Sequence, residues 1–196
     1  MFEQLKEKIK DKKVILLGEL HGTKEIPQVI LDFLKSLDEE FNLLMEIPDE
    51  FQKNIEEFYK EPSPDGRNSK EYLDLIKTLN KKLYCIDSFA KNQEEKEENL
   101  AKNILDFSNE KKTIAILGEI HASKEKINFG EQEIIPTGNI LKEKLKGDLL
   151  CVRIKPSKGK YFNFEIKDLK DSNDEFDKNF DYVLNIGEVS PCSFIK

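Results

Sequence analysis

The chain has 196 residues, of which 38% are hydrophobic and 36% are charged, and its formal net charge is −7. This length supports one hydrophobic core, so we expect a single domain spanning residues 1–196. Lysine is interleaved with aspartate and glutamate, without the basic stripe that nucleic-acid binding requires. No segment resembles a signal peptide or a membrane span. We therefore expect a cytoplasmic protein with neither nucleic acid nor membrane as a partner.

Helices and strands are predicted to alternate along the chain. A lysine-rich helix at 2–10 precedes the apolar run 14–17, which ends at Gly18 and is too short for a helix. A helix beginning at Thr23 or Lys24 has Pro27 in its first turn. The further predicted strands are 41–47, 83–86 and 113–117, and the further helices are 49–59, 71–79 and 93–107. This alternation predicts an α/β fold with a mostly parallel central sheet and helices on both faces.

The C-terminal part follows a different pattern. After Gly147, the runs 149–154, 161–166 and 181–186 indicate strands joined by short polar turns, so we expect the sheet to finish with antiparallel strands. Segment 61–69 is expected to be a surface loop, and 93–98 a solvated helix face. Residues 136–139 indicate a helix start that can hold an anion.

An internal repeat is the most informative feature of the sequence. Residues 17–25, Leu-Gly-Glu-Leu-His-Gly-Thr-Lys-Glu, match residues 117–125, Leu-Gly-Glu-Ile-His-Ala-Ser-Lys-Glu, and six positions are identical. The chain contains 2 histidines, His21 and His121, and both fall at the same place in the repeat. This coincidence favours a functional pair over scattered surface or core histidines.

The position of the repeat predicts where the two histidines lie. Each copy follows a predicted parallel strand, so both Glu-x-His units belong to the carboxyl edge of the sheet, where ligands bind in open α/β folds. A doubly wound sheet that reverses after its third strand would place strands one and four side by side, with His21 near His121. Glu46 and Asp87, at the ends of strands two and three, would face the same crevice.

Two chemistries fit this set of side chains. Histidine nitrogens with carboxylate oxygens suit a divalent metal, namely Zn, Mn, Co or ferrous iron. Alternatively, a histidine held in one tautomer by a carboxylate takes a proton from water without any metal. Glu46 is the most telling carboxylate, because closing an apolar strand with a charge costs solvation unless a partner is present. Glu19, Glu119 and Asp87 have simpler alternative roles as helix caps or lysine partners. The candidate residues are His21, His121, Glu19 and Glu46, with Glu119 and Asp87 as further metal ligands.

The same segments resemble a known superfamily. Residues 18–25 resemble the first motif of the erythromycin esterase, ChaN-like and TraB/Tiki superfamily, 45–48 is similar to its second motif, and 118–121 resembles its later Gly-x-x-His motif. Residues 98–104 are similar to the helix that follows the third strand in that superfamily. The resemblance implies a hydrolase-type site in which His21 is a base or metal ligand. It also implies that Glu19 and Glu46 hold the water or metal and that His121 completes the site.

The sequence also departs from the superfamily pattern. Esterases of this superfamily resemble longer chains with helical additions over the cleft. Its haem-uptake members are typically exported. In many members an arginine follows the position of Asp87, whereas residues 88–91 of this chain are Ser-Phe-Ala-Lys. We therefore expect a small hydrolase, metal-assisted, acting on a small-molecule or peptide substrate. The alternatives are a non-catalytic protein that binds a metal in the same crevice, with haem iron the less favoured ligand, and a protein that acts through surface contacts.

Overall fold

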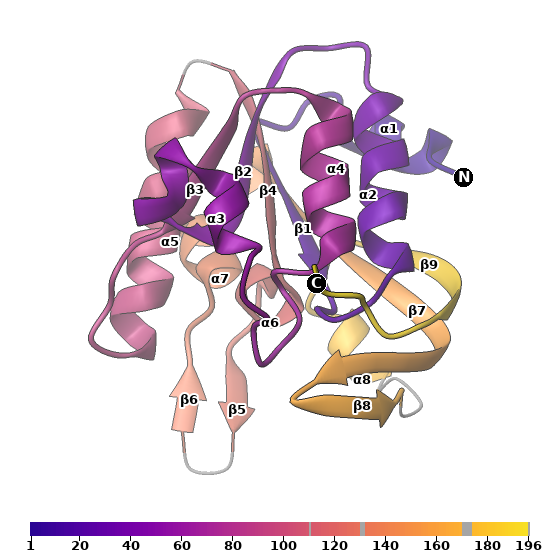
Figure 1. Ribbon diagram of the computed structural model, residues 1–196. Helices are drawn as coiled ribbons and strands as arrows, with labels where there is room; N and C mark the ends of the chain where they lie inside the picture. The colour runs from indigo at the N-terminus through magenta and orange to yellow at the C-terminus, as the bar shows by residue number, and fades with distance from the viewer. Residues whose placement is uncertain (110, 130–131, 170–173, 196) are drawn as a thin grey trace.

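A central sheet of seven strands organises the part of the chain that the computed structural model describes, residues 1–109, 111–129, 132–169 and 174–195. The strand order is β3-β2-β4-β1-β7-β8, and β9 also pairs with β7 (Figure 1). Neighbouring strands are parallel except for β7 and β8, which are antiparallel. The strands are β1 (Val14–Glu19), β2 (Phe41–Pro48), β3 (Leu83–Asp87), β4 (Lys112–Gly118), β7 (Leu149–Asn163), β8 (Glu165–Asp168) and β9 (Tyr182–Val189).

Helices cover both faces of this sheet because strand side chains alternate between two apolar clusters. Ile15 and Leu17 of β1 face the cluster formed with α1 (Glu3–Ile9), α2 (Glu25–Lys35) and α4 (Lys70–Leu79). Val14 and Leu16 face the cluster formed with α5 (Gln93–Ser108), α6 (Glu119–Ala122) and α7 (Thr137–Leu145). The central strands β1, β2 and β4 are buried on both sides, which is why their sequences contain continuous apolar runs.

The remaining elements are short. They are η1 (Asp49–Lys53), α3 (Ile55–Phe58), the hairpin of β5 (Ile127–Phe129) and β6 (Gln132–Ile134), η2 (Lys146–Asp148) and α8 (Asp174–Asp177). None of the helices in the described ranges is both long enough and apolar enough to span a bilayer.

The α/β class, the mostly parallel sheet, the helices on both faces and a C-terminal antiparallel pair are confirmed. The strand order differs from a simple reversal after the third strand, because β4 lies between β2 and β1. Strands β1 and β4 are nevertheless neighbours, as expected. The expected helix 49–59 is broken at Asn54, where φ is −146° and ψ is 74°. Gln52 explains the break, since its side chain binds the backbone of β3 at Leu83 and Cys85 and fixes a 3₁₀ turn there.

The expected strand 161–166 is wrong, because a hairpin turn lies inside it. Phe164 has a φ of 61°, a left-handed conformation that separates β7 from β8. The runs that begin at Leu149 and Tyr161 belong to one strand, β7, and β9 is parallel to it. The long second half of β7 and β8 together extend past the carboxyl edge of the sheet beside α6 (Figure 1).

Candidate functional site

The two copies of the repeat leave the sheet at the same edge but one residue out of step. In the β1–β4 pairing, Gly18 lies opposite Leu117 and Glu19 opposite Gly118. Glu19 is therefore the last residue of a strand, whereas Glu119 begins the short helix α6. His21 lies in the turn before α2, and His121 lies within α6. Corresponding residues of the two similar copies therefore lie in different surroundings.

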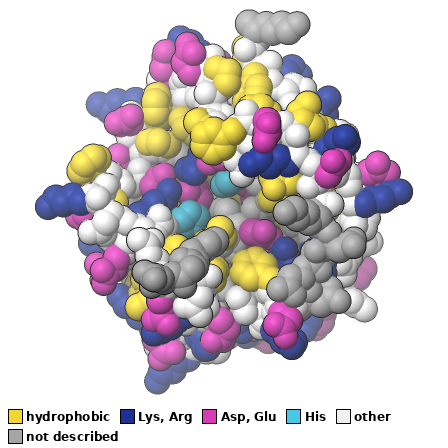
Figure 2. All heavy atoms as spheres, turned by 90° about the horizontal axis from the view of Figure 1, so that it is seen from below, with side chains coloured by type: hydrophobic (Ala, Val, Ile, Leu, Met, Phe, Trp, Pro, Cys, Tyr) yellow, Lys and Arg dark blue, Asp and Glu magenta, His cyan; other side chains and the backbone are white. Residues whose placement is uncertain are grey.

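Gly118 is the point at which three of the predicted residues meet. A Cβ atom at Gly118 would lie 3.0 Å from His21 Nε2, 3.5 Å from His121 Cδ2 and 3.7 Å from Glu46 Oε2. The backbone N–H of Gly118 donates to Glu46 Oε2 at 3.1 Å. From below the view of Figure 1, the histidine side chains lie in a hollow next to acidic side chains (Figure 2). The absence of a side chain at Gly118 therefore leaves room for His21, while a Cβ there would meet His121 at an ordinary contact distance.

His21 is held by Glu19. Its Nδ1 pairs with Glu19 Oε1, and the side chains are 20% and 2% exposed respectively. Burial opposes protonation of the ring, but the negative charge of Glu19 outweighs it and raises the pKa of His21. In the neutral ring, the proton on Nδ1 faces Glu19, which leaves Nε2 as the basic atom beside Gly118.

His121 lies between two carboxylates. Its Nδ1 is 2.7 Å from Glu97 Oε1, and its Nε2 is 3.4 Å from Glu46 Oε1. Burial opposes the charged form, but Glu46 and then Glu97 outweigh it and raise the pKa of His121 to about 10. Both ring nitrogens consequently act as donors, and the side chain is an imidazolium at neutral pH.

Glu97 was not predicted, because segment 93–98 was expected to be a solvated face. Its side chain is 1% exposed. The backbone N–H and the hydroxyl of Thr137 both donate to Glu97 Oε2, at 2.8 Å each. The predicted helix start at 136–139 is confirmed as the start of α7, and the anion that Thr137 binds there is this internal carboxylate. Helical spacing was the available signal, since Glu97 shares a face with the buried Leu100, Ala101 and Ile104.

Glu46 is the carboxylate that pairs with the positively charged side chains of the site. Lys96 Nζ is 2.8 Å and Arg67 Nη1 is 3.1 Å from Glu46 Oε1. Burial opposes ionisation, but His121, Arg67 and Lys96 outweigh it and lower the pKa of Glu46 well below its usual range. Asp87 joins from the next strand, 3.2 Å from Lys96 and 3.6 Å from Arg67. These cations are the partners that a carboxylate at the end of an apolar strand requires.

Neither cation was predicted as a site residue. Arg67 comes from loop 61–69, which was expected to lie on the surface, and its Nε also donates to Asp65 at 2.7 Å. Lys96 extends from the first turns of α5. The chain has arginine only at positions 67 and 153, and lysine elsewhere, which was a usable signal. Arginine suits carboxylate pairs because its planar fork donates several hydrogen bonds at once.

Glu119 does not join the carboxylates around the histidines. Its Oε2 accepts a hydrogen bond from Arg153 Nε at 2.8 Å, and Arg153 Nη1 donates to Asp177 of α8 at 2.6 Å. The one-residue offset of the repeat explains this placement, since Glu119 begins α6 next to β7 while Glu19 remains in β1. The structure thus brings together His21, His121, Glu19, Glu46 and Asp87, and directs Glu119 toward β7.

Glu46 is paired with protein cations, whereas Glu19 Oε2 is buried without a hydrogen-bond partner among the residues that the structure describes. In the described ranges, no group of three or more His, Cys, Asp or Glu side chains is placed to hold a metal ion. Glu46 Oε1 contacts Lys96, Arg67 and His121, so the space beside this carboxylate is occupied by positive side chains. Around Glu46, this arrangement of side chains does not fit the expected divalent metal.

Comparisons with known proteins identify the fold. No family model and no curated protein matches the sequence. Two solved structures match over 100% of this chain, each with 12% sequence identity. One is a protein from Bacillus cereus, with a TM-score of 0.67 over 93% of its chain. The other is described as a succinoglycan biosynthesis protein, with a TM-score of 0.71 over 92% of its chain. At this identity, the likeness shows that the chain shares their α/β fold.

Proposed function

We propose that this protein is a hydrolase in which His21 is the general base that activates water. The observation that carries the proposal is the contact between buried Glu19 and partly buried His21, whose ring Nε2 faces Gly118 with the His121 imidazolium beside it. A histidine oriented by a carboxylate is a common base in hydrolysis, because the carboxylate fixes the tautomer and stabilises the charged ring.

Different charge environments give the two histidines different roles. His21 contacts one carboxylate and can exist in its neutral, basic form, whereas His121 lies between two and keeps its proton. Two titratable groups with unlike surroundings in one site mark an acid and base pair. His121 is therefore unsuited to accept a proton at neutral pH and well suited to stabilise negative charge.

The proposed reaction is hydrolysis of an ester or amide in a small-molecule or peptide substrate. His21 Nε2 accepts a proton from water as the water oxygen attacks the carbonyl carbon, and the carbonyl π electrons move onto its oxygen. The positive charge of His121 stabilises this oxyanion, with Lys96 and Arg67 contributing through the same cluster. Collapse of the intermediate breaks the bond to the leaving group, which takes the proton from His21. Glu46 keeps the cations in place by bonding to each.

A metal-assisted reaction remains the second form of this proposal. It would use His21, His121 and Glu46 as ligands, and Lys96 and Arg67 would have to move from Glu46 to admit the ion. The metal would polarise the substrate carbonyl or lower the pKa of bound water. The same displacement would be needed for a protein that holds a metal without turnover.

Hydrolysis assays separate these forms. We would purify the full chain without added metal, measure its metal content, and test ester, peptide and phosphate-ester substrates with and without EDTA. We expect hydrolysis that survives EDTA and falls by about 10²-fold or more in His21→Ala. Glu125→Gln is the matched control, because it changes an exposed acid of the second repeat copy. The melting temperature of each variant reports whether the fold is retained.

Each other outcome has a defined meaning. Activity that EDTA removes and a divalent ion restores would favour the metal-assisted form. Bound metal without turnover on any substrate would favour a binding protein. Full activity in His21→Ala would refute the role of His21 as base in either form.

A further inference from the structure

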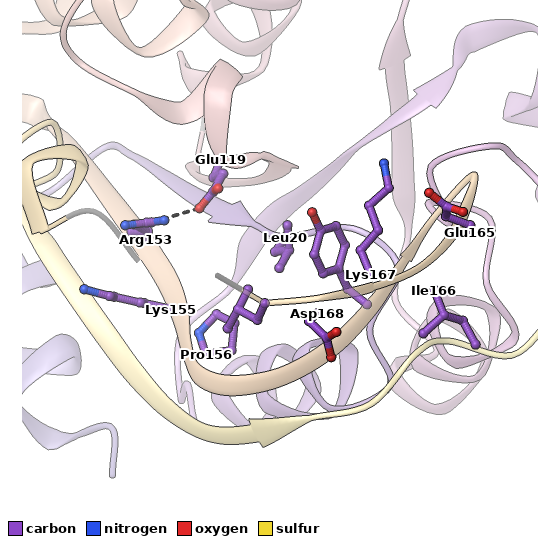
Figure 3. A pocket seen from close by; sticks show the side chains of 11 residues that line it. Leu20, Glu119, Arg153, Lys155, Pro156, Glu165, Ile166, Lys167 and Asp168 are labelled. Carbon is purple, nitrogen blue, oxygen red and sulfur yellow. Dashed lines mark hydrogen bonds and ion pairs between the residues drawn. The ribbon is translucent and has the colours of Figure 1, made fainter. Parts of the chain in front are cut away.

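A pocket of about 790 Å³ opens between the repeat and the β7–β8 hairpin (Figure 3). Leu20, which lies between Glu19 and His21, and Glu119, two residues before His121, both line it. The hairpin is fixed to the first motif, because the Phe162 N–H donates to the Gly22 carbonyl at 2.9 Å. A ligand in this pocket would therefore contact Leu20, the residue that precedes the proposed base in the chain. The pocket has no part in the chemistry described above.

The inner wall of the pocket is charged but balanced. Arg153 and Lys155 line it and are each 8% exposed. Arg153 is bonded to Glu119 and Asp177, and Lys155 Nζ donates to Asp177 at 2.6 Å. Among the contacts within residues 132–169 and 174–195 and with Glu119, two cations thus meet two carboxylates in one network. An anionic ligand would compete with Glu119 and Asp177, and a cationic ligand would face Arg153 and Lys155, so neither charge gains a net attraction here.

The hairpin side of the pocket carries both donors and acceptors together with apolar surface. Lys167 supplies N–H donors and Glu165 supplies carboxylate oxygens, while Asp168 pairs with Lys160 at 3.2 Å (Figure 3). Tyr161 adds an aromatic ring and a hydroxyl, and Pro156 adds an apolar face. Ligand pockets commonly use apolar walls for contact area and a few polar groups for orientation.

A neutral polyhydroxylated ring matches this combination best. Each hydroxyl group both donates and accepts, so it can bond to Lys167 and to Glu165, while the C–H face of the ring can pack against Tyr161. It brings no charge that the balanced inner wall would oppose. We propose that this pocket binds a neutral sugar group of the substrate, so that the hydrolase acts on an ester or amide carried by a glycosyl unit. This inference rests on the proposed function for its place in a reaction.

Saturation-transfer NMR on the full chain tests binding without requiring turnover. The probes are maltose, cellobiose and lactose at millimolar concentration, compared with glucuronic acid and glucosamine as charged sugars. We expect at least one neutral disaccharide to bind, and both charged sugars to bind more weakly. Lys167→Met should weaken binding by about tenfold, through loss of one charged hydrogen-bond donor. Lys158→Met is the matched control, because Lys158 is an exposed lysine of β7 that pairs with Glu188.

The outcomes distinguish this inference from the proposed function. No binding of any neutral disaccharide, stronger binding of a charged sugar, or unchanged binding in Lys167→Met would overturn the sugar subsite. His21→Ala should bind the sugar as the wild type does, because His21 does not line the pocket. Sugar binding without hydrolysis of any substrate would leave the subsite standing while the hydrolase proposal fails. Hydrolysis of simple esters without sugar binding would do the reverse.

Discussion

Replacing Glu97 with glutamine is expected to lower the pKa of His121. Glutamine keeps the size of the side chain but removes the negative charge 2.7 Å from the ring, and its single oxygen can replace only one of the two carboxylate oxygens that accept from His121 Nδ1 and Thr137. In the wild type, the pKa of His121 lies at about 10 against an ordinary 6.5. The charged ring is therefore stabilised by about 5 kcal/mol in total, as an upper bound set by both neighbouring carboxylates.

The sign of the resulting pH dependence follows from the raised pKa. His121 holds a proton in the folded state that it loses more readily when unfolded, so its contribution to stability is fully present below pH 6.5 and is lost as the pH rises through about 10. Glu46 supplies the larger part of the electrostatic stabilisation and remains in Glu97→Gln. We expect the variant to lower the pKa of His121 by about one unit or more. The unfolding free energy near neutral pH should fall by roughly 1–2 kcal/mol.

Imidazole Cε1–H signals in two-dimensional NMR measure this pKa directly. The chain has 2 histidines, so His21→Asn leaves one signal and assigns the other. Glu98→Gln is the control, since Glu98 is an exposed neighbour on the same helix. Titration of wild-type His121 near pH 6.5, or an identical pKa in wild type and Glu97→Gln, would refute the account of this imidazolium.

Two glycine substitutions test the geometry of the site. Gly118→Ala would place a Cβ 3.0 Å from His21 Nε2, so we expect hydrolysis to fall by about tenfold or more through misplacement of the base, measured as kcat/KM. Gly147→Ala, where a Cβ meets nothing within 4 Å, should be silent, and equal activity in the two variants would contradict this reasoning. Gly22→Ala would force a side chain into a left-handed conformation, with φ at 80°, and into overlap with the Phe162 carbonyl. It should lower the unfolding free energy by at least about 1–2 kcal/mol in urea denaturation, and a loss of only a few tenths would show that the hairpin moves freely.

Hydrophobic periodicity was sufficient to predict most of the sheet. Apolar runs predicted the strands β1 to β4, and the repeat predicted that two histidines leave the same edge. Hydrophobic periodicity could not predict the hairpin turn at Phe164, because an aromatic residue is not one of the residue types that mark a left-handed turn. Nor did it predict that β4 lies between β2 and β1, because strand order depends on packing between elements distant in sequence.

The candidate site was less predictable, because the residues that pair with His121 and Glu46 come from segments that were expected to be exposed to solvent. Glu97 lies in a charged stretch that looks solvated, but His121 of α6 and Thr137 of α7 bind its carboxylate and its side chain is buried. Arg67 comes from a loop rich in proline and glycine, and no periodicity aims its side chain at Glu46. The repeat itself misled for Glu119, since a one-residue offset in strand register sends its carboxylate to Arg153. The similarity between the two copies gives no indication that their strands are offset by one residue.

The pH dependence of kcat/KM in wild type and Glu19→Gln tests most directly the claim that the Glu19–His21 pair is the base. The base must be neutral, so activity should fall as the pH drops through the raised pKa of His21. Removing the charge of Glu19 removes the main cause of that raised pKa. Glu19→Gln should therefore have a lower maximal rate, and its acidic limb should lie at lower pH than that of the wild type. An acidic limb at the same pH in both proteins, or a profile without an acidic limb in the wild type, would contradict the assignment.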